Sequence, residues 1–406
     1  MSLPPPMPLE DAQARLLALA APLPIERVDV EGALGRYLAA PLHARRTQPA
    51  ADLSAMDGYA VAHGDLAGPW RIVGESAAGH PFAGAVSGGT AVRVSTGAVL
   101  PQGTGAVILQ EDVARDAERL HLSGEAPHPA HKHIRPCGMD FADSHEVIAQ
   151  GTLLGPAQVA LALAAGHKHL PVCRLPRLVV IDSGDELAAD PEACAPHQVP
   201  ASNGAMVLAL ARALPVDARR LGPVEDTLEA ITAALEASAE ADVIVTSGGA
   251  SVGDHDLVRP ALEAWGASLD FWRVAIKPGK PILVATRERA GRRQIILGLP
   301  GNPVSSFVTA YHFLMPLLRA LLGARDAVAR QVTTRLAAPV RANGPRREFL
   351  RAQWDGAAVT PLTLQDSGAL SSLSASNVLI DRPALAPAAA TGDEVRVYLL
   401  ASGGIA

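Results

Sequence analysis

The spacing of apolar residues divides the first part of the chain into helical and β-prone stretches. Apolar residues recur at helical spacing over residues 9–20, and Pro22 ends this run. Over residues 41–135, short β-prone runs alternate with glycine turns, which predicts a small β-rich domain. Helical spacing returns at residues 156–165. Because the two helical stretches flank the β-rich one, we predict an elongated helical stalk domain that is split by an insertion.

From residue 178 onward, strand and helix patterns alternate along the chain. Continuous apolar runs of strand length indicate strands that are covered on both faces, and helical patterns follow them. This alternation predicts a three-layer α/β domain with a largely parallel sheet. The strand runs are residues 178–181, 243–245 and 295–297, and the helical patterns are residues 204–214, 227–238 and the stretch from 303.

The longest apolar stretch, residues 304–322, is interrupted by polar residues, so we predict a buried helix and not a membrane span. After residue 324, β-prone runs return and predict a small C-terminal β domain. The fold class is therefore multidomain, α/β plus β. The expected domains are the split helical stalk at 1–40 and 140–175, the β-rich insertion at 41–139, the α/β domain at 176–323 and the C-terminal β domain at 324–406.

Composition and charge exclude several classes of protein. Hydrophobic residues make up 49% of the chain and charged residues 19%, which is a globular composition. The net charge is −6, and a nucleic-acid-binding face would need clustered basic residues. The three widely spaced cysteines, Cys137, Cys173 and Cys194, argue against a disulfide framework or a zinc finger. The N-terminus lacks a signal-peptide pattern, so we expect a cytoplasmic protein. From the charge and the interrupted apolar stretch we expect that it binds neither nucleic acid nor membrane.

A glycine-rich loop, residues 247–256, follows the strand run at 243–245. At the carboxyl end of a parallel strand such a loop lies where ligands bind, and its amides can hold a phosphate. Asp254 and Asp256 would repel a bare phosphate, which favours a divalent cation between them. A tight glycine turn with two solvated acids is the alternative. The candidate ligand-binding residues of the loop are Gly248, Gly249, Ser251 and Gly253.

Two other segments suit an anion. Residues 299–305 connect a strand to a helix, and the free N–H groups of that helix end attract negative charge. Residues 276–281 hold two lysines in a proline-rigid loop, so the lysines lose less entropy when they bind an anion. Simple helix capping and exposed lysines are the alternatives. The candidate residues are Pro300, Gly301, Asn302, Lys277 and Lys280.

Acidic and hydroxyl side chains follow the first strand of the α/β region. Residues 183–187 begin with Ser183 and contain Glu186, and acids at a strand's carboxyl end suit a metal ion or ribose hydroxyls. A helix N-terminus that carries acids is the alternative. In the β-rich stretch, Asp57 and Thr96 each precede a glycine, which is typical of turns. His312, inside the apolar helix, is predicted to be a core residue with its hydrogen bonds satisfied.

The order of these motifs carries a resemblance that no single motif carries. The chain resembles the MoeA/gephyrin E-domain family, the molybdopterin molybdenumtransferases, over nearly its whole length. Two positions depart from the usual family pattern. Ser183 stands where the family usually has threonine, and residues 138–140 are Gly-Met-Asp where Gly-Glu-Asp is usual, which removes one acid. The motifs that carry the resemblance are residues 54–60, 96–97, 183–187, 247–256, 276–281 and 299–305.

The resemblance implies four domains, with the α/β domain as the molybdopterin-binding one, and an elongated homodimer. It implies an active site between the α/β domain of one subunit and the β-rich domain of the other. The implied substrates are adenylylated molybdopterin and molybdate, with Mg²⁺ as cofactor, and other cofactor-assembly proteins and apo-molybdoenzymes as further partners. The carried-over positions are Asp57, Thr96, Glu186, Asp226, Asp256, Lys277 and Lys280 as catalytic residues, and Arg135, Arg351 and Ser371 as substrate-binding residues.

The implied reaction brings two anions together, because molybdate is a dianion and the adenylylated pterin carries a diphosphate. Lys277, Lys280 and Arg135 would offset the repulsion, and Glu186 and Asp256 are the expected metal ligands. Two alternatives stay open: a molybdopterin adenylyltransferase, which would need only the α/β domain, and a non-enzymatic molybdopterin-binding scaffold. An unrelated phosphate-binding enzyme of α/β type is a third.

Overall fold

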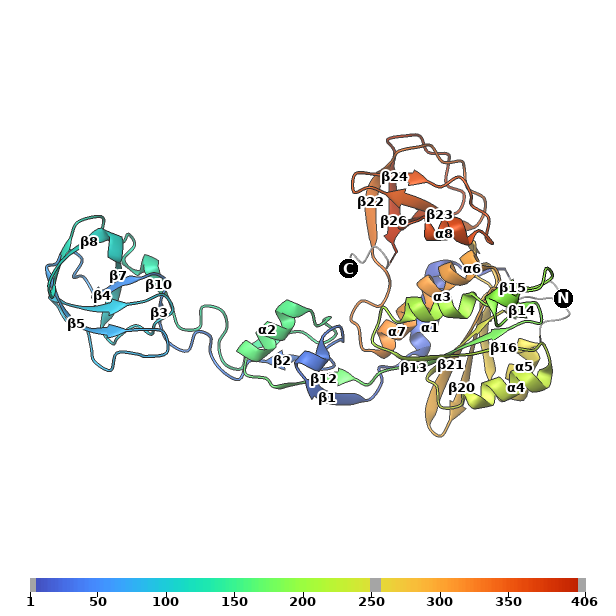
Figure 1. Ribbon diagram of the computed structural model, residues 1–406, viewed down its shortest axis with the longest axis horizontal. Helices are drawn as coiled ribbons and strands as arrows, with labels where there is room; N and C mark the ends of the chain where they lie inside the picture. Colours follow the sequence, from blue (N-terminus) through green and yellow to red (C-terminus); the bar gives the residue numbers. More distant parts are fainter. Residues whose placement is uncertain (1–4, 249–256, 401–406) are drawn as a thin grey trace.

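The computed structural model describes residues 5–248 and 257–400. The molecule is elongated, with a β-rich domain at one end and a stalk in the middle (Figure 1). The α/β domain and a C-terminal β domain form the other end. The predicted multidomain α/β plus β architecture is therefore confirmed.

The β-rich domain is built on a six-stranded sheet with the order β7-β4-β6-β5-β9-β8. Alternating side chains of these strands build two small cores, one of which contains Trp70, Ile108 and Leu120. A separate short pair, β3 (Leu53–Ser54) and β10 (Ile134–Arg135), lies where the chain enters and leaves the domain. The sheet strands are β4 (Gly58–Ala62), β5 (Trp70–Ser76), β6 (Thr90–Val94), β7 (Thr104–Leu109), β8 (Val113–Asp116) and β9 (Arg119–Leu122).

The stalk contains the chain on its way to the β-rich domain and on its way back. β1 (Ile25–Asp29) pairs antiparallel with β12 (His169–Cys173), and β2 (Leu42–His43) pairs with β11 (Glu146–Ile148). The helix α2 (Pro156–Ala164) packs beside them. Extended pairs therefore make up most of the stalk, together with this one α-helix within the described residues.

The α/β domain has a six-stranded sheet with the order β16-β13-β17-β21-β20-β18. β16, β13, β17 and β21 are parallel, whereas β20 and β18 are antiparallel. Leu178 and Val180 face a core with α3, α6 and α7, while Val179 and Ile181 face a core with α4 and α5. The strands are β13 (Arg177–Ser183), β16 (Asp217–Val224), β17 (Val243–Ser247), β18 (Ser268–Trp272), β20 (Leu283–Arg289) and β21 (Arg292–Leu299). The helices are α3 (Asn203–Ala211), α4 (Leu228–Ala237), α5 (Val258–Ala264), α6 (Pro303–Thr309) and α7 (Met315–Leu321).

The first helix, α1 (Leu9–Leu19), does not lie in the stalk, where residues 1–40 were expected. Leu9 and Leu16 are buried in the α/β core, against α7 and the π-helical turn Ala310–Leu314 that joins α6 to α7. The helical pattern identified which face of α1 is buried but not which domain covers that face. The α/β domain covers it, and its apolar core is larger than that of the stalk.

One helical run within the described residues, Pro303–Leu321, is long and apolar enough to cross a membrane. In the structure, 83% of its most apolar window is buried inside the protein. This run covers one face of the α/β sheet (Figure 1). The prediction of a buried helix at 304–322 is confirmed.

The C-terminal domain is a closed barrel. Its sheet has the order β19-β23-β24-β22-β26-β25, and an additional pairing of β23 with β25 closes it. β19 (Ile276–Lys277) belongs to the α/β chain segment, so the two domains share a sheet edge. The remaining elements are β22 (Gln331–Leu336), β23 (Arg347–Trp354), β24 (Ala358–Pro361), β25 (Val378–Arg382), β26 (Glu394–Leu399) and the helix α8 (Leu370–Ser374).

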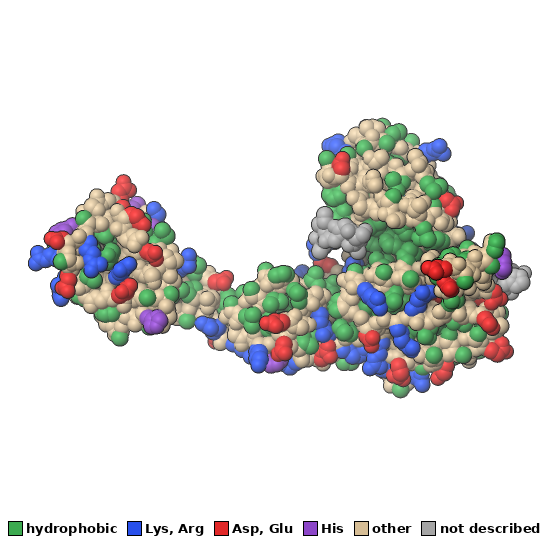
Figure 2. Space-filling view, in the orientation of Figure 1, with side chains coloured by type: hydrophobic (Ala, Val, Ile, Leu, Met, Phe, Trp, Pro, Cys, Tyr) green, Lys and Arg blue, Asp and Glu red, His purple; other side chains and the backbone are tan. Residues whose placement is uncertain are grey.

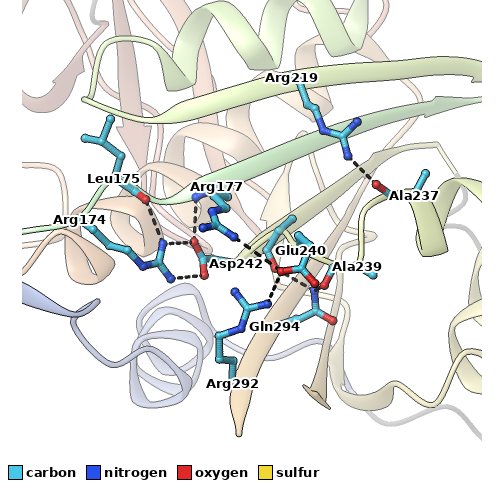
Figure 3. A network of polar contacts seen from close by, with 11 residues as sticks. Arg174, Leu175, Arg177, Arg219, Ala237, Ala239, Glu240, Asp242, Arg292 and Gln294 are labelled. Carbon is cyan, nitrogen blue, oxygen red and sulfur yellow. Dashed lines mark hydrogen bonds and ion pairs between the residues drawn. The ribbon is translucent and has the colours of Figure 1, made fainter. Parts of the chain in front are cut away.

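A polar network joins the stalk to the α/β domain (Figure 3). Arg174, directly after β12, donates two hydrogen bonds of 2.7 Å to the carboxylate of Asp242, just before β17. The backbone N–H of Arg177 donates to the same carboxylate. Burial by itself would raise the pKa of Asp242, but these hydrogen bonds outweigh burial and lower it. A bidentate pair of this kind fixes the direction in which the stalk leaves the α/β domain.

Candidate active site

A cavity of about 900 Å³ lies at the carboxyl ends of β13, β17 and β21. This is the edge of a parallel sheet where α/β proteins bind ligands. Gly368 and Leu370 of the C-terminal barrel also line the cavity, so two domains build its wall. Seven predicted site residues line it: Ser183, Glu186, Asp226, Gly248, Pro300, Gly301 and Asn302.

Three acids gather at one side of the cavity. The backbone N–H of Asp226 donates a 3.0 Å hydrogen bond to the carboxylate of Asp185, and Glu186 is next in the chain. Burial raises the pKa of Asp226, and the negative charges of Asp185 and Glu186 raise it further. The site therefore concentrates negative charge at a point where a cation would stabilise it.

Gly248 lies in the cavity wall with a backbone φ of +108°. A Cβ at this position would lie 2.8 Å from the backbone oxygen of Ser183. A side chain is therefore excluded on two grounds, backbone conformation and space. The glycine therefore lets the end of β17 lie against the backbone of Ser183, and its own backbone lines the cavity.

Asn302 occupies the predicted N-cap of α6, but within the described residues its side chain makes no capping hydrogen bond. Two of the N–H groups expected to be free at this helix end are not available to a ligand. Pro303 has no N–H, and the N–H of Val304 donates to the backbone oxygen of Ser367 in the C-terminal domain. This helix end therefore holds the barrel against the α/β domain, and Asn302 keeps its side chain for the cavity.

The two predicted lysines are not among the described residues that line the cavity, although Pro281, which follows Lys280 in the chain, is. Lys277 Nζ lies 2.6 Å from the carboxylate of Glu348 on β23, and just over half of the lysine side chain is exposed. Lys280 is half-buried. The positive charge of Lys277 is therefore paired with a carboxylate of the barrel.

Arg351 was expected to bind substrate, but the structure places it in the barrel interior. Its guanidinium donates to the backbone oxygens of Leu364 and Asp366 and to Ser372 Oγ, at 3.0–3.2 Å. The side chain is 1% exposed, and it holds the segment that carries Gly368 to the cavity. Ser371 is exposed on α8 and is not among the described lining residues.

The other predicted residues meet on the β-rich domain. Asp57 accepts hydrogen bonds from the backbone N–H of Thr96 at 2.6 Å and from its hydroxyl at 3.0 Å, and these lower the pKa of Asp57. Arg135 on β10 pairs with Leu53, four residues before Asp57. This group and the cavity lie at opposite ends of the molecule (Figure 1). One chain therefore does not bring all predicted residues together. Gly249, Ser251, Gly253 and Asp256 lie outside the described residues.

Comparisons with known proteins agree with this architecture. A family model for the MoeA N-terminal region (domains I and II) matches residues 7–166, one for a probable molybdopterin-binding domain matches 179–320, and one for the MoeA C-terminal region (domain IV) matches 333–400. A molybdopterin molybdenumtransferase of Haemophilus influenzae is 35% identical over 322 residues, which cover 78% of each chain. The chain belongs to the molybdopterin molybdenumtransferase family.

Other members of the family match over greater lengths. Molybdopterin molybdenumtransferase 2 of Mycobacterium tuberculosis is 30% identical over 404 residues, which are 95% of this chain and 96% of that one. The crystal structure of the molybdopterin biosynthesis MoeA protein of Pyrococcus horikoshii OT3 superposes with a TM-score of 0.84 at 26% identity. It covers 97% of this chain and 100% of that chain.

Sequence reasoning missed three residues that support the site in this family member. Asp182, directly before Ser183, is fully buried and accepts hydrogen bonds from Arg220 Nε at 2.5 Å and from the backbone N–H of Gly204 at 2.8 Å. Asn203 Nδ2 donates to the backbone oxygen of Gly301 at 2.6 Å. A charged residue directly after an apolar strand run was the available signal for Asp182. The partners of Asn203 and Arg220 depend on long-range packing.

Proposed function

We propose that this chain is a molybdopterin molybdenumtransferase that inserts molybdate into adenylylated molybdopterin and releases AMP, in molybdenum cofactor biosynthesis. The cavity carries this proposal. Its wall combines the open backbone at Gly248, the acids Glu186 and Asp226, and two residues of the C-terminal barrel. A cavity of about 900 Å³ is large enough for an extended nucleotide-like ligand.

In the proposed reaction two Mo–S bonds form from the dithiolene sulfurs of the substrate while two Mo–O bonds of molybdate break, and the two oxygens take up protons and leave as water. One water molecule hydrolyses the phosphoanhydride, and AMP leaves. The chain supplies no nucleophile. The backbone of Gly248 lines the cavity, and Lys277 and Lys280, which precede the lining residue Pro281 in the chain, would offset the repulsion between the diphosphate and molybdate. Asn302 has its side chain available for a polar contact in the cavity. The protein acts by positioning and by charge.

A magnesium ion fits the donors of this cavity as a proposed cofactor. Within residues 5–248 and 257–400, no three His, Cys, Asp or Glu side chains form a group that could hold a metal. Magnesium usually keeps several waters and takes one or two carboxylates together with substrate phosphates. Glu186 is the proposed protein ligand within the described residues, with Asp256 of the adjoining loop as the second. When bound, the ion would polarise the phosphoanhydride.

We further propose that the active form is a cytoplasmic homodimer. The support is the position of the candidate residues. Asp57, Thr96 and Arg135 lie together on the β-rich domain, and the cavity lies at the other end of the chain. A two-fold pair of antiparallel chains would place the β-rich domain of each subunit near the cavity of the other, with two equivalent sites.

Incubation with adenylylated molybdopterin, Mg²⁺ and molybdate tests the function, with AMP release as the measurement. Release that depends on molybdate is expected. An adenylyltransferase would instead consume ATP with bare molybdopterin, and a scaffold would bind the pterin without reaction. Neither alternative is favoured, because relatives that share nearly the whole chain are named molybdenumtransferases. ATP consumption without molybdate-dependent AMP release would overturn the proposal.

A further inference from the structure

A second cavity, of about 600 Å³, lies in the stalk. Its walls come from β1, from β2 and the residues after it, and from β12 and the residues before it. Its described lining residues include no aspartate or glutamate, although the whole chain has a net charge of −6. A local excess of cationic groups of this kind attracts an anion. We call this cavity the stalk pocket, and its basic residues are Arg27, His43, Arg45, His167 and His169.

Backbone contacts bring two of these basic residues together. The N–H of Arg45 donates to the backbone oxygen of Ala165 at 2.9 Å. Gly166 has a φ of +91°, and a Cβ on it would lie 3.3 Å from the Cβ of Arg45. The next residue is His167, whose Nε2 lies 2.8 Å from the backbone oxygen of His43. Because a carbonyl oxygen only accepts, Nε2 carries the hydrogen of this bond, and the ring of His167 is fixed in the pocket wall.

The side chains that remain available in the stalk pocket suit an anion. His167 is 7% exposed, and its Nδ1 has no hydrogen-bond partner among the described residues. A neutral Nδ1 accepts a hydrogen bond from a protonated anion, and a protonated Nδ1 donates one to a fully ionised anion. Within residues 5–248 and 257–400, neither Arg27 nor Arg45 forms an ion pair with a carboxylate. Two guanidinium groups and one imidazole nitrogen are therefore available to a ligand.

Acidic side chains lie around the stalk pocket, and Figure 2 shows acidic side chains among basic ones along the lower edge of the stalk. Asp29 lies 3.1 Å from Nε2 of His169, so His169 is the least available of the basic residues. The carboxylate of Asp143 accepts a 3.3 Å hydrogen bond from Ser144 Oγ, and Glu146 lies on β11 beside β2. The charge of a bound anion must therefore lie against the two arginines and the buried imidazole, away from these carboxylates.

We propose that the stalk pocket binds a small tetrahedral oxyanion, either free or as the phosphate group of a small organic ester. The planar forks of Arg27 and Arg45 suit the oxygens of such a group, and Nδ1 of His167 adds a third contact. Pro41 and Pro171 also line the pocket, and they offer an apolar wall to the organic part of an ester. A volume of about 600 Å³ is in the range of small-molecule sites. This site goes beyond the proposed reaction, because the two cavities share no described lining residue.

The test is whether inorganic phosphate protects Arg27 and Arg45 of the full-length chain from phenylglyoxal, a reagent that modifies arginine, as measured by peptide mass mapping. Saturating phosphate is expected to slow the modification of both residues. Arg71 and Arg119, which lie opposite each other on β5 and β9, are the matched controls, and all four arginines are exposed. The controls should react at the same rate with and without phosphate. Phosphate that protects all four arginines equally, or none of them, would overturn the site.

A substitution tests whether the two arginines hold the same anion. In Arg45→Met, the phosphate concentration that gives half-maximal protection of Arg27 is expected to rise about tenfold, because one charge-assisted contact is lost. Arg45→Lys keeps the charge but not the planar fork, so its value should lie between those of Arg45→Met and the wild type. Arg71→Met is the control and should match the wild type. An unchanged half-protection concentration in Arg45→Met would show that the arginines do not share a ligand and would overturn the proposal.

The same protection of Arg27 and Arg45 distinguishes the two sources of the anion. Protection by AMP at a lower concentration than by phosphate or molybdate supports an organic ester, because the apolar wall then contributes to binding. Protection by phosphate or molybdate at the same or a lower concentration than by AMP supports a free oxyanion. Adenosine carries no anionic group and should not protect. Adenosine that protects as well as AMP would overturn recognition of an anion in the stalk pocket.

Discussion

His312 gives a prediction whose magnitude follows from its surroundings. It lies in the π-helical turn, is 1% exposed, and its ring stacks on Phe349 of the barrel at a centroid distance of 4.3 Å. The expectation that its hydrogen bonds are satisfied is wrong for Nε2, which is buried without a partner within the described residues. Burial, with a smaller contribution from Arg347, lowers the pKa of His312 to about 3.

A histidine held neutral in the folded state makes stability depend on pH. Between pH 6.5 and about 3, the unfolded chain binds a proton at this position and the folded chain does not. The contribution to stability is therefore full above pH 6.5 and is lost as the pH falls. At pH 5, which is about 1.5 units below the ordinary histidine pKa, the loss amounts to about 2 kcal/mol.

Urea unfolding at pH 7.5 and pH 5 measures this loss. The comparison is between the wild type and His312→Phe, which keeps an aromatic ring in the stack but cannot take up a proton. The variant is expected to lose about 2 kcal/mol less than the wild type between the two pH values. His121→Gln, at an exposed histidine of β9, is the control and should follow the wild type. Equal pH dependence of wild type and His312→Phe would refute the reasoning.

Three other substitutions test the site. Asp182→Asn leaves Arg220 without its charged partner and should cost about 3 kcal/mol of unfolding free energy, the low end for a buried pair because Arg220 is partly exposed. The control is Asp217→Asn on β16, the edge strand that carries Arg220, and it should change the unfolding free energy by less than about 0.5 kcal/mol. Equal costs of the two substitutions in urea titrations would contradict a stabilising Asp182–Arg220 pair. Gly248→Ala should lower kcat/KM about a hundredfold because the added Cβ displaces the backbone of Ser183 in the cavity wall, and wild-type kinetics would show that this close packing does not shape the site. Lys277→Met should raise the molybdate concentration needed for half-maximal AMP release about tenfold, and an unchanged molybdate dependence would remove that lysine from the mechanism.

Local patterns predicted the elements of the fold well. The apolar runs at 178–181, 243–245 and 295–297 all became central strands of the α/β sheet, because buried parallel strands need both faces apolar. The helix predicted at 227–238 is α4, with Thr227 as its N-cap. Four of the candidate site residues, Ser183, Glu186, Asp226 and Gly248, line one cavity.

Long-range partners were beyond the sequence. The antiparallel strands β20 and β18 at the sheet edge carry charged residues among their apolar ones, and the sequence pattern did not predict them as strands. Closure of the barrel depends on the pairing of β23 with β25, which no local pattern encodes. Local patterns likewise do not encode the ion pair of Lys277 with Glu348 or the backbone carbonyl groups that accept hydrogen bonds from Arg351. Each of these contacts joins segments whose meeting is decided by the packing of whole domains.

The central claim is that molybdate-dependent AMP release occurs at a site completed by two chains. Coexpression of Asp57→Ala and Glu186→Ala chains tests it most directly. Each variant by itself should be inactive. In a mixed dimer, one site carries both substitutions and the other carries neither, and about half of the dimers are mixed. We predict that the coexpressed protein recovers about a quarter of the wild-type AMP release per site. A mixture that stays as inactive as the separate variants would contradict the account.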